Sequence, residues 1–461
     1  MLRRVFRAFC RTINGPETAR KDAIDRHTID PKGWPLPVVP DKIKNFIGLS
    51  SFQMLAMFRR GLFYSFLTIY LRYYLGMSVT ETTLFATGPM VLNVLFQTFA
   101  WGPLSDRWQL RRTFIIAGEL LAAVGTVGVW YAHILTQSPH FAGYIIIIGL
   151  SLVEIFWSMS NVGWSALISD IYPARSRNAI QGNLSAVGGL GRIMGVWIGG
   201  VLYDGYGAAY AGWGFHRGAL FFVAAGVMLI SVFPLLMLPE GGIRQKNNSR
   251  TAADLREDNA SARIFIIFLV AMTFINFGRN SIAVIFPQYL VLEGGFGVSS
   301  VSLSYIVNMQ SAAIMITGLF AGWISRHMGD DRSLLAGTAL TIAALCVLAA
   351  TESLPMVYLC NFFRGISEVL IFSSSYACAS ILIPPENRAR LFSLFNATYF
   401  LSWGLAGTFI AGPAIDWLVA TGTAEPFAYR VSFLLAAAIT VIGFIIEYLL
   451  VKRQAGSSTP E

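Results

Sequence analysis

Five arginines and three glutamates lie inside stretches of the chain that are otherwise apolar. They are Arg59, Arg60, Arg192, Arg279, Arg364, Glu119, Glu154 and Glu368. A charged side chain at the centre of a bilayer costs about 2.5–3.5 kcal/mol on insertion scales, so such groups persist where a partner, water or a ligand stabilises them. Arginine binds carboxylates and phosphates through its fork of N–H donors, and a buried carboxyl gains or loses a proton as its surroundings change. The excess of arginine therefore favours a site for an organic anion or a zwitterion.

Five of these residues form the predicted substrate and proton site: Arg60, Glu154, Arg279, Arg364 and Glu368. Arg364 and Glu368 are four residues apart, so they share one helix face. Arg59 and Arg60 lie about 100° apart on a helix, so only one of them faces the site, and we assign that role to Arg60. The alternative is that these charges are structural pairs that hold helices together. Further candidates for the wall of the site are Asn93, Gln97, Trp157, Trp164, Asn276, Asn280, Asn308, Gln310, Tyr376, Tyr399 and Trp403.

The elements that carry these charges are predicted to be membrane-spanning helices. The chain is 55% hydrophobic and only 13% charged, too apolar for a soluble protein of 461 residues. Its apolar runs reach about 20 residues, the length that crosses the hydrocarbon core as a helix. We expect an all-α integral membrane protein with twelve spans, at residues 45–71, 80–101, 113–133, 141–169, 179–203, 217–238, 263–291, 299–323, 333–351, 355–383, 391–419 and 429–451.

The basic residues predict the orientation of these spans. Most of the 34 Lys and Arg lie before the first span, after even-numbered spans or in the tail, whereas Arg72, Arg217 and Arg430 lie on the other side. The positive-inside rule places both termini in the cytoplasm, and we expect a multi-pass protein of the cell membrane. The net charge of +9 is spread over short loops, so it does not indicate nucleic-acid binding. The expected segments are a cytoplasmic arm with a basic amphipathic stretch, a six-helix bundle, a cytoplasmic linker, a second six-helix bundle and a cytoplasmic tail, over residues 1–44, 45–240, 241–262, 263–451 and 452–461.

A dense group of charges, GPLSDRWQLRR at residues 102–112, lies between the second and third predicted spans. It resembles the loop motif G-x-L-x-D-R-x-G-R-K/R of the major facilitator superfamily, from which Gln109 and Leu110 depart. The resemblance implies a transporter of twelve helices with a conformational latch at the cytoplasmic helix ends. The latch residues are Gly102, Asp106, Arg107, Arg111 and Arg112. The alternative for the arginines is topological anchoring alone.

The two halves of the chain repeat. Arg60 and Arg279 stand at nearly the same distance before Gly102 and Gly322, and the loop after Gly322 is a weaker copy in which Arg326 replaces the aspartate. The resemblance implies two six-helix halves with a substrate cavity between them. It also implies that Arg60 and Arg279 correspond to the substrate-binding arginines of organic-anion transporters. Proton-coupled members of the family similarly combine an arginine in span one with a carboxylate in span four, the position of Glu154.

Glycines recur every fourth residue in the fifth predicted span, at Gly191, Gly195 and Gly199, followed by Gly200. Glycines on one helix face let a neighbouring helix approach closely, so we expect these residues to form a packing face. The segment is also similar to the G-x-x-x-G-P-x-x-G-G motif of drug and metabolite antiporters, with Val196 in place of the proline. An export function is therefore the alternative.

We predict a secondary active transporter of a small solute, coupled to protons, that works by alternating access. The alternatives are a multidrug or metabolite proton antiporter and, from another class, a membrane scaffold or sensor that transports nothing. No enzyme is predicted, because the five histidines show no paired metal-ligand spacing and no nucleotide-binding motif is visible. We expect no cofactor and no metal. The expected partners are a small-molecule substrate, protons and membrane lipid, with no nucleic acid, and the chain is expected to be a monomer.

Overall fold

The computed structural model consists mainly of long helices. It describes residues 41–172, 174–206, 211–241, 258–382 and 388–457. Lys44 and Asn45 mark a division of the chain, and residues 45–461 form one unit. The predicted basic arm lies almost entirely outside the described residues, and so does most of the predicted linker. Their roles stay predictions.

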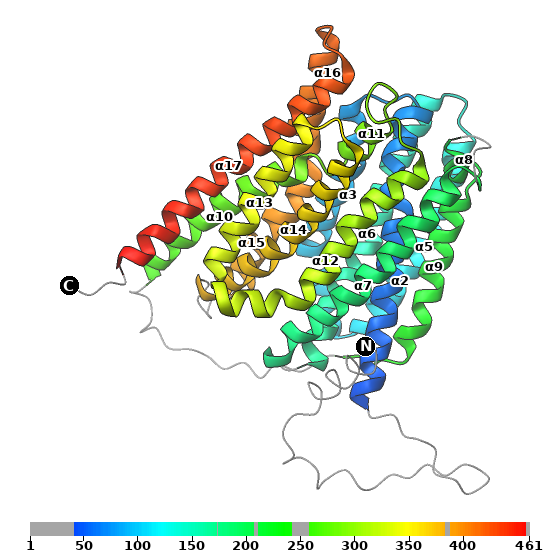
Figure 1. The fold of residues 1–461 in the computed structure, drawn as a ribbon. Coiled ribbons are helices and arrows are strands. Elements are labelled where there is room, and N and C mark those ends of the chain that lie inside the picture. The colour runs from blue at the N-terminus through cyan, green and yellow to red at the C-terminus, as the bar shows by residue number, and fades with distance from the viewer. Residues whose placement is uncertain (1–40, 173, 207–210, 242–257, 383–387, 458–461) are drawn as a thin grey trace, which may run out of the picture. The chain divides into compact units, whose positions relative to one another are not determined.

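Among its described residues, the first half contains six long helices and two short ones. Figure 1 shows how they are arranged. A π-helical segment at Gln97–Trp101 joins α3 to α4, so these elements continue one rod. The helices are α2 (Asp41–Ile69), α3 (Val79–Phe96), α4 (Gly102–Trp108), α5 (Arg111–Ile134), α6 (Pro139–Ile171), α7 (Ala174–Tyr203), α8 (Trp213–His216) and α9 (Ala219–Leu236).

The second half also contains a rod with a π-helical junction. A π-helical segment at Gly407–Ala411 joins α15 to α16, as the segment at Gln97–Trp101 joins α3 to α4. The helices are α10 (Asp258–Ser281), α11 (Ile285–Val291), α12 (Ser300–Met328), α13 (Asp330–Ala350), α14 (Leu354–Leu382), α15 (Arg388–Ala406), α16 (Gly412–Ala420) and α17 (Glu425–Ser457).

All twelve predicted spans fall on helices, so the predicted fold class is confirmed. Within the described residues, eleven segments are long and apolar enough to cross a membrane. The twelfth is α2, which has 29 residues and carries Arg59 and Arg60 among its apolar side chains. In lipid, every backbone N–H and C=O must be paired within the protein, and long helices meet that demand segment by segment.

The seventh predicted span, at residues 263–291, is confirmed as a segment long and apolar enough to cross a membrane. A short turn at residues 282–284 separates α10 from α11 within it. Pro287 follows the break, and it has no N–H to donate to the carbonyl four residues earlier, which favours an interruption there. The break leaves Arg279 in the last turn of α10.

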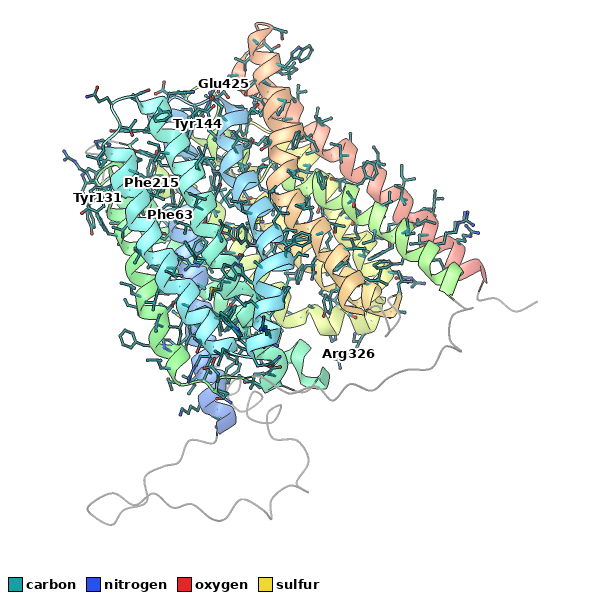
Figure 2. The ribbon with its side chains drawn as sticks, turned by 180° about the vertical axis from the view of Figure 1, so that it is seen from behind. Phe63, Tyr131, Tyr144, Phe215, Arg326 and Glu425 are labelled. Atoms are coloured by element: carbon teal, nitrogen blue, oxygen red, sulfur yellow. The ribbon has the colours of Figure 1, made fainter. Side chains whose placement is uncertain are left out.

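Contacts between the halves define two ends of the bundle. Figure 2 shows Glu425 at one end and Arg326 at the other. The rod of α3 and α4 begins beside α16, at the end that holds Glu425, and runs toward the other end. Arg107, in the last turn of α4, therefore lies at the same end as Arg326. We call the end with Arg107 and Arg326 the motif end and the end with Glu425 the opposite end.

Polar contacts between the halves gather at the opposite end. Nη2 of Arg72 lies 2.8 Å from Oε1 of Glu425, and the hydroxyls of Thr83 and Thr408 are 2.7 Å apart. Ser300 of α12 donates to the carbonyl of Gly200 in α7 at 3.0 Å. The structure is therefore closed between the halves at this end.

The glycines of α7 pack against α2. A Cβ added at Gly191 or Gly195 would clash with the backbone carbonyl of Met54 or Phe58, and one at Gly199 would lie 2.6 Å from the carbonyl of Leu62. The fourth glycine has a different neighbour, because a Cβ at Gly200 would lie 2.9 Å from the carbonyl of Ser300 in α12. Three of the predicted packing glycines thus join two helices of one half, and Gly200 contacts the other half.

Candidate substrate and proton site

The two neighbouring arginines of α2 have different surroundings. Arg59 is 4% exposed, and its Nη1 lies 2.6 Å from Oε2 of Glu119 on α5. The other carboxylate oxygen of Glu119 accepts a hydrogen bond from Ser160 at 2.9 Å, and the guanidinium of Arg59 lies 3.7 Å from the ring centre of Trp157. Arg59 is therefore neutralised and stacked inside the first half, as expected of a structural ion pair.

Arg60 is exposed and points elsewhere. It interacts electrostatically at longer range with Glu154 of α6 and with Tyr399 of α15. Tyr399 belongs to the second half, so the charge of Arg60 acts on residues of both halves. The different surroundings of Arg59 and Arg60 follow from the angle of about 100° between successive helical residues.

Glu154 is the carboxyl that faces Arg60 from the first half. It is 3% exposed and accepts a hydrogen bond from the side-chain amide of Asn93. Gln97 donates in turn to Oδ1 of Asn93 at 2.6 Å. Glu154 thus terminates a chain of amides along α3, and the nearby arginines act on it at longer range.

Three predicted residues of the second half meet in one small cavity. Arg279 of α10, with Arg364 and Glu368 of α14, line it. Glu368 accepts a hydrogen bond from Gln310 of α12 at 2.9 Å, and Arg364 donates to Asn361 at 3.1 Å. The other lining residues are Asn280, Gln310, Thr341, Leu345 and Ser367.

Arg279 has spare hydrogen-bonding capacity in this cavity. It is 9% exposed, and its Nε donates to Asn276 at 3.0 Å. Among the described residues, its Nη2 has no hydrogen-bond partner. Its guanidinium lies 5.3 Å from the ring centre of Tyr399. A buried guanidinium donor without an acceptor is costly, and an anionic ligand would satisfy it.

Tyr399 is the point where charges from both halves converge. Glu368, Arg279, Arg192 and Arg60 all interact with it electrostatically. Arg192 of α7 also interacts with Arg364. Arg192 was not among the predicted site residues, although its position in an apolar span was a visible signal. Three arginines from both halves therefore interact with one tyrosine, and Arg364 interacts with two of these arginines.

The predicted latch residues lie at the motif end with contacts inside the first half. Arg111 is buried, donates to Ser105 and lies 3.6 Å from Oδ2 of Asp170 at the end of α6. Arg112 donates to the carbonyl of Leu238 at 2.8 Å and pairs with Glu240 at 3.1 Å. Of the other predicted latch residues, Arg107 is exposed. The N–H of Gly102 donates to the carbonyl of Gln97. The side chain of Asp106 lies outside the described part of the chain.

Comparison with known proteins identifies the class. The family model of the Major Facilitator Superfamily matches residues 49–407 and 268–461. The chain belongs to this superfamily, and it is a multi-pass membrane transporter.

Several relatives are remote. The chain is 21% identical over 376 residues to the multidrug resistance protein MdtG of Enterobacter lignolyticus. The matched region covers 80% of this chain and 83% of that relative. It is 21% identical over 159 residues to the galactose-proton symporter of Escherichia coli, covering 34% of each chain.

The solved structures with similar folds are also transporters. A bacterial homologue of the human lysosomal transporter Spinster, in an inward-facing and unoccupied conformation, matches with a TM-score of 0.65 and 17% identity, over 90% of this chain and 97% of that one. The nucleoside transporter NupG matches with a TM-score of 0.61 and 15% identity, over 90% of this chain and 100% of that one. At these identities the likeness establishes the fold alone.

Proposed function

We propose that this transporter carries a small organic anion or zwitterion and couples its movement to protons. The observation that carries the proposal is a group of four arginines. Arg60, Arg192 and Arg279 interact with Tyr399, and Arg364 interacts with Arg192 and lines one cavity with Arg279. Four like charges repel one another, and a ligand with negative charge relieves that repulsion. The unsatisfied Nη2 of Arg279 supplies a donor for a carboxylate or phosphate oxygen.

Glu368 extends this site toward zwitterions. Glu368 lines the same cavity as Arg279 and Arg364. Its carboxylate accepts a hydrogen bond from the side-chain amide of Gln310. An ionised carboxylate can accept several hydrogen bonds. A substrate that carries an amino group beside its acid group would therefore place opposite charges on Arg279 and Glu368.

Glu154 is the proposed proton carrier. It is buried with an amide partner, and the guanidinium groups of Arg59 and Arg60 act on it only at longer range. A buried charge without a close counter-ion is unfavourable, so the carboxyl responds to proton supply and to any change in its distance from Arg60. The galactose-proton symporter among the relatives supports coupling of this kind.

The proposed orientation places the motif end in the cytoplasm, from the distribution of Lys and Arg. The contacts at the opposite end then close the substrate path to the outside. Alternating access requires these contacts to break when the site opens outward. The latch predicted at residues 102–112 would form in that outward-open state.

A thermal-shift screen of the purified transporter tests the substrate class. The library holds organic anions, phosphorylated metabolites, amino-acid-like zwitterions, lysolipids and lipophilic cations. A ligand that binds only the folded state raises the melting temperature. Anions or zwitterions should stabilise the wild type and Arg326→Gln, a surface arginine at the motif end, but not Arg279→Gln or Arg60→Ala. Equal anion shifts in all four proteins would contradict the arginine site.

A multidrug exporter is the second candidate function. The relative named multidrug resistance protein MdtG covers most of the chain, and the glycines of α7 match part of an antiporter motif. In the same screen, this candidate predicts shifts with lipophilic cations that Arg279→Gln leaves unchanged. A deletion strain with unaltered sensitivity to a broad panel of lipophilic compounds would count against it.

A further inference from the structure

Asp416 makes an unusual contact at the opposite end of the bundle. This residue lies in α16 of the second half, and its carboxylate accepts hydrogen bonds from two backbone N–H groups of the first half. Oδ1 accepts from Val79 at 3.1 Å and Oδ2 accepts from Thr80 at 2.8 Å. Both donors belong to the first turn of α3. A carboxylate from one half therefore caps a helix of the other.

The cap completes the hydrogen bonding of that helix end. The first turn of a helix has N–H groups without partners inside the helix. Here Ser78 and Glu81 satisfy two of them through a capping box inside the first half, with N···O distances of 2.7 and 3.2 Å. The N–H groups of Val79 and Thr80 depend on Asp416. Separation of the halves would remove both acceptors at once, together with the favourable interaction of the carboxylate with the helix dipole.

The chain carries a similar short sequence at the two ends of this interface. Gly412-Pro413-Ala414-Ile415-Asp416 follows the π-helical segment at Gly407–Ala411, and Gly102-Pro103-Leu104-Ser105-Asp106 follows the one at Gln97–Trp101. In each segment the N–H of the glycine donates to the carbonyl five residues earlier. The following proline has no N–H to donate, which favours this wider turn. Asp416 thus occupies in α16 the position that Asp106 occupies in α4.

The packing of the rods makes room for the contact. A Cβ added at Gly412 would lie 2.8 Å from the Cα of Thr80, and one at Gly404 would lie 3.0 Å from the carbonyl of Ala86. The hydroxyl of Thr87 donates to the carbonyl of Gly404 at 2.8 Å. Glycine at these positions lets the backbone of the α15–α16 rod approach that of α3 closely. Because of this close approach, Asp416 reaches the N-terminus of α3.

We propose that Asp416 is the latch that holds the opposite end closed, and that it is the counterpart of Asp106 at the motif end. The carboxylate binds α3 while the halves are closed at the opposite end, and it releases α3 when that end opens. The two GPxxD segments then stabilise opposite states of the transport cycle. This latch acts on the conformational equilibrium, whatever the substrate.

Distances between spin labels on the two halves test this latch. Gln137, in the loop between α5 and α6, and Thr421, after α16, are exposed at the opposite end and would carry the labels in a variant without native cysteines. Asp416→Ala should raise the ratio of long to short label distances roughly tenfold, the effect of a lost N-cap. Asp106→Ala should lower that ratio. Asp416→Asn keeps one oxygen acceptor and should give a smaller rise, so it serves if the alanine variant fails to fold.

Glu352→Ala is the matched control. Glu352 also lies at the opposite end, but it pairs with Arg430 of the same half at 3.1 Å. Its removal changes the charge without touching the interface, so the distance ratio should equal that of the wild type. The proposal is overturned if Asp416→Ala and Asp416→Asn leave the ratio unchanged, or if Glu352→Ala raises it equally. A shift of Asp106→Ala in the same direction as Asp416→Ala would overturn the proposed correspondence of the two aspartates.

Discussion

Removing one partner of the buried ion pair between Arg59 and Glu119 should strongly destabilise the first half. Its side chains are 5% and 3% exposed, and the charges are 2.6 Å apart. Glu119→Gln removes the counter-charge and leaves the guanidinium of Arg59 buried over Trp157. Breaking one partner of a buried pair costs about 3–5 kcal/mol. We expect Glu119→Gln and Arg59→Met each to lower the free energy of unfolding by an amount in this range.

A double-mutant cycle separates the pair from other effects. Replacing both charges by apolar side chains of similar size is often neutral, so Arg59→Met with Glu119→Leu should cost about 1 kcal/mol or less, whereas Glu119→Leu alone should cost about 3–5 kcal/mol. The coupling energy in the cycle of Arg59→Met and Glu119→Leu would then be at least about 5 kcal/mol in magnitude. The assay is denaturant unfolding in mixed micelles, followed by tryptophan fluorescence and extrapolated linearly.

Arg60→Met is the matched control for this cycle, because it removes the neighbouring charge from an exposed position. Surface substitutions usually change stability by less than about 0.5 kcal/mol. Single-variant losses that simply add in the double variant would refute the idea that Arg59 and Glu119 form one unit. An Arg60→Met loss as large as that of Arg59→Met would refute the distinction between the two arginines.

Two further predictions concern the proton and the glycine face. Glu154→Gln keeps an oxygen that accepts the hydrogen bond from Asn93, so the variant should fold. In liposomes it should exchange substrate at zero pH gradient but lose the uptake that a proton gradient drives. Gradient-driven uptake at the wild-type rate would rule Glu154 out as the proton carrier. Gly195→Ala places a methyl group against the backbone carbonyl of Phe58 and should destabilise the protein by about 1–3 kcal/mol or more. Gly226 has open space around it, so Gly226→Ala should be neutral or should stabilise the protein by up to about 1 kcal/mol. The same micelle unfolding assay compares these two glycine variants, and equal effects would contradict the packing argument.

The helices themselves could be read from the sequence. A helix needs about 20 apolar residues to cross the hydrocarbon core, and it pairs its backbone N–H and C=O groups within itself. Each span is therefore visible in the sequence as a continuous apolar run. The break in the seventh span escaped that signal, because Pro287 and the polar residues beside Arg279 lie inside an otherwise apolar run. Composition marks the length of a span but not a short interruption within it.

The inventory of charged residues was also visible in the sequence, but their pairing was not. Arg59 and Arg60 are neighbours of the same type, and only the rotation of α2 against α5 and α6 decides that Arg59 is buried against Glu119 while Arg60 is exposed. Arg192 joins the site because α7 packs against α12, a contact between residues far apart in the chain.

The same division holds for the ends of the bundle. The sequence determined that residues 102–112 place a dense group of charges between two spans, because periodicity and charge are local properties of a chain. The segment was expected as a short loop, but Gly102–Trp108 is helix α4. Only the tertiary structure decided that Arg112 binds Glu240 and that Asp416 caps α3. Contacts of this kind depend on the angle and depth at which helices pack, and small changes in those quantities exchange one partner for another without any change in the sequence pattern.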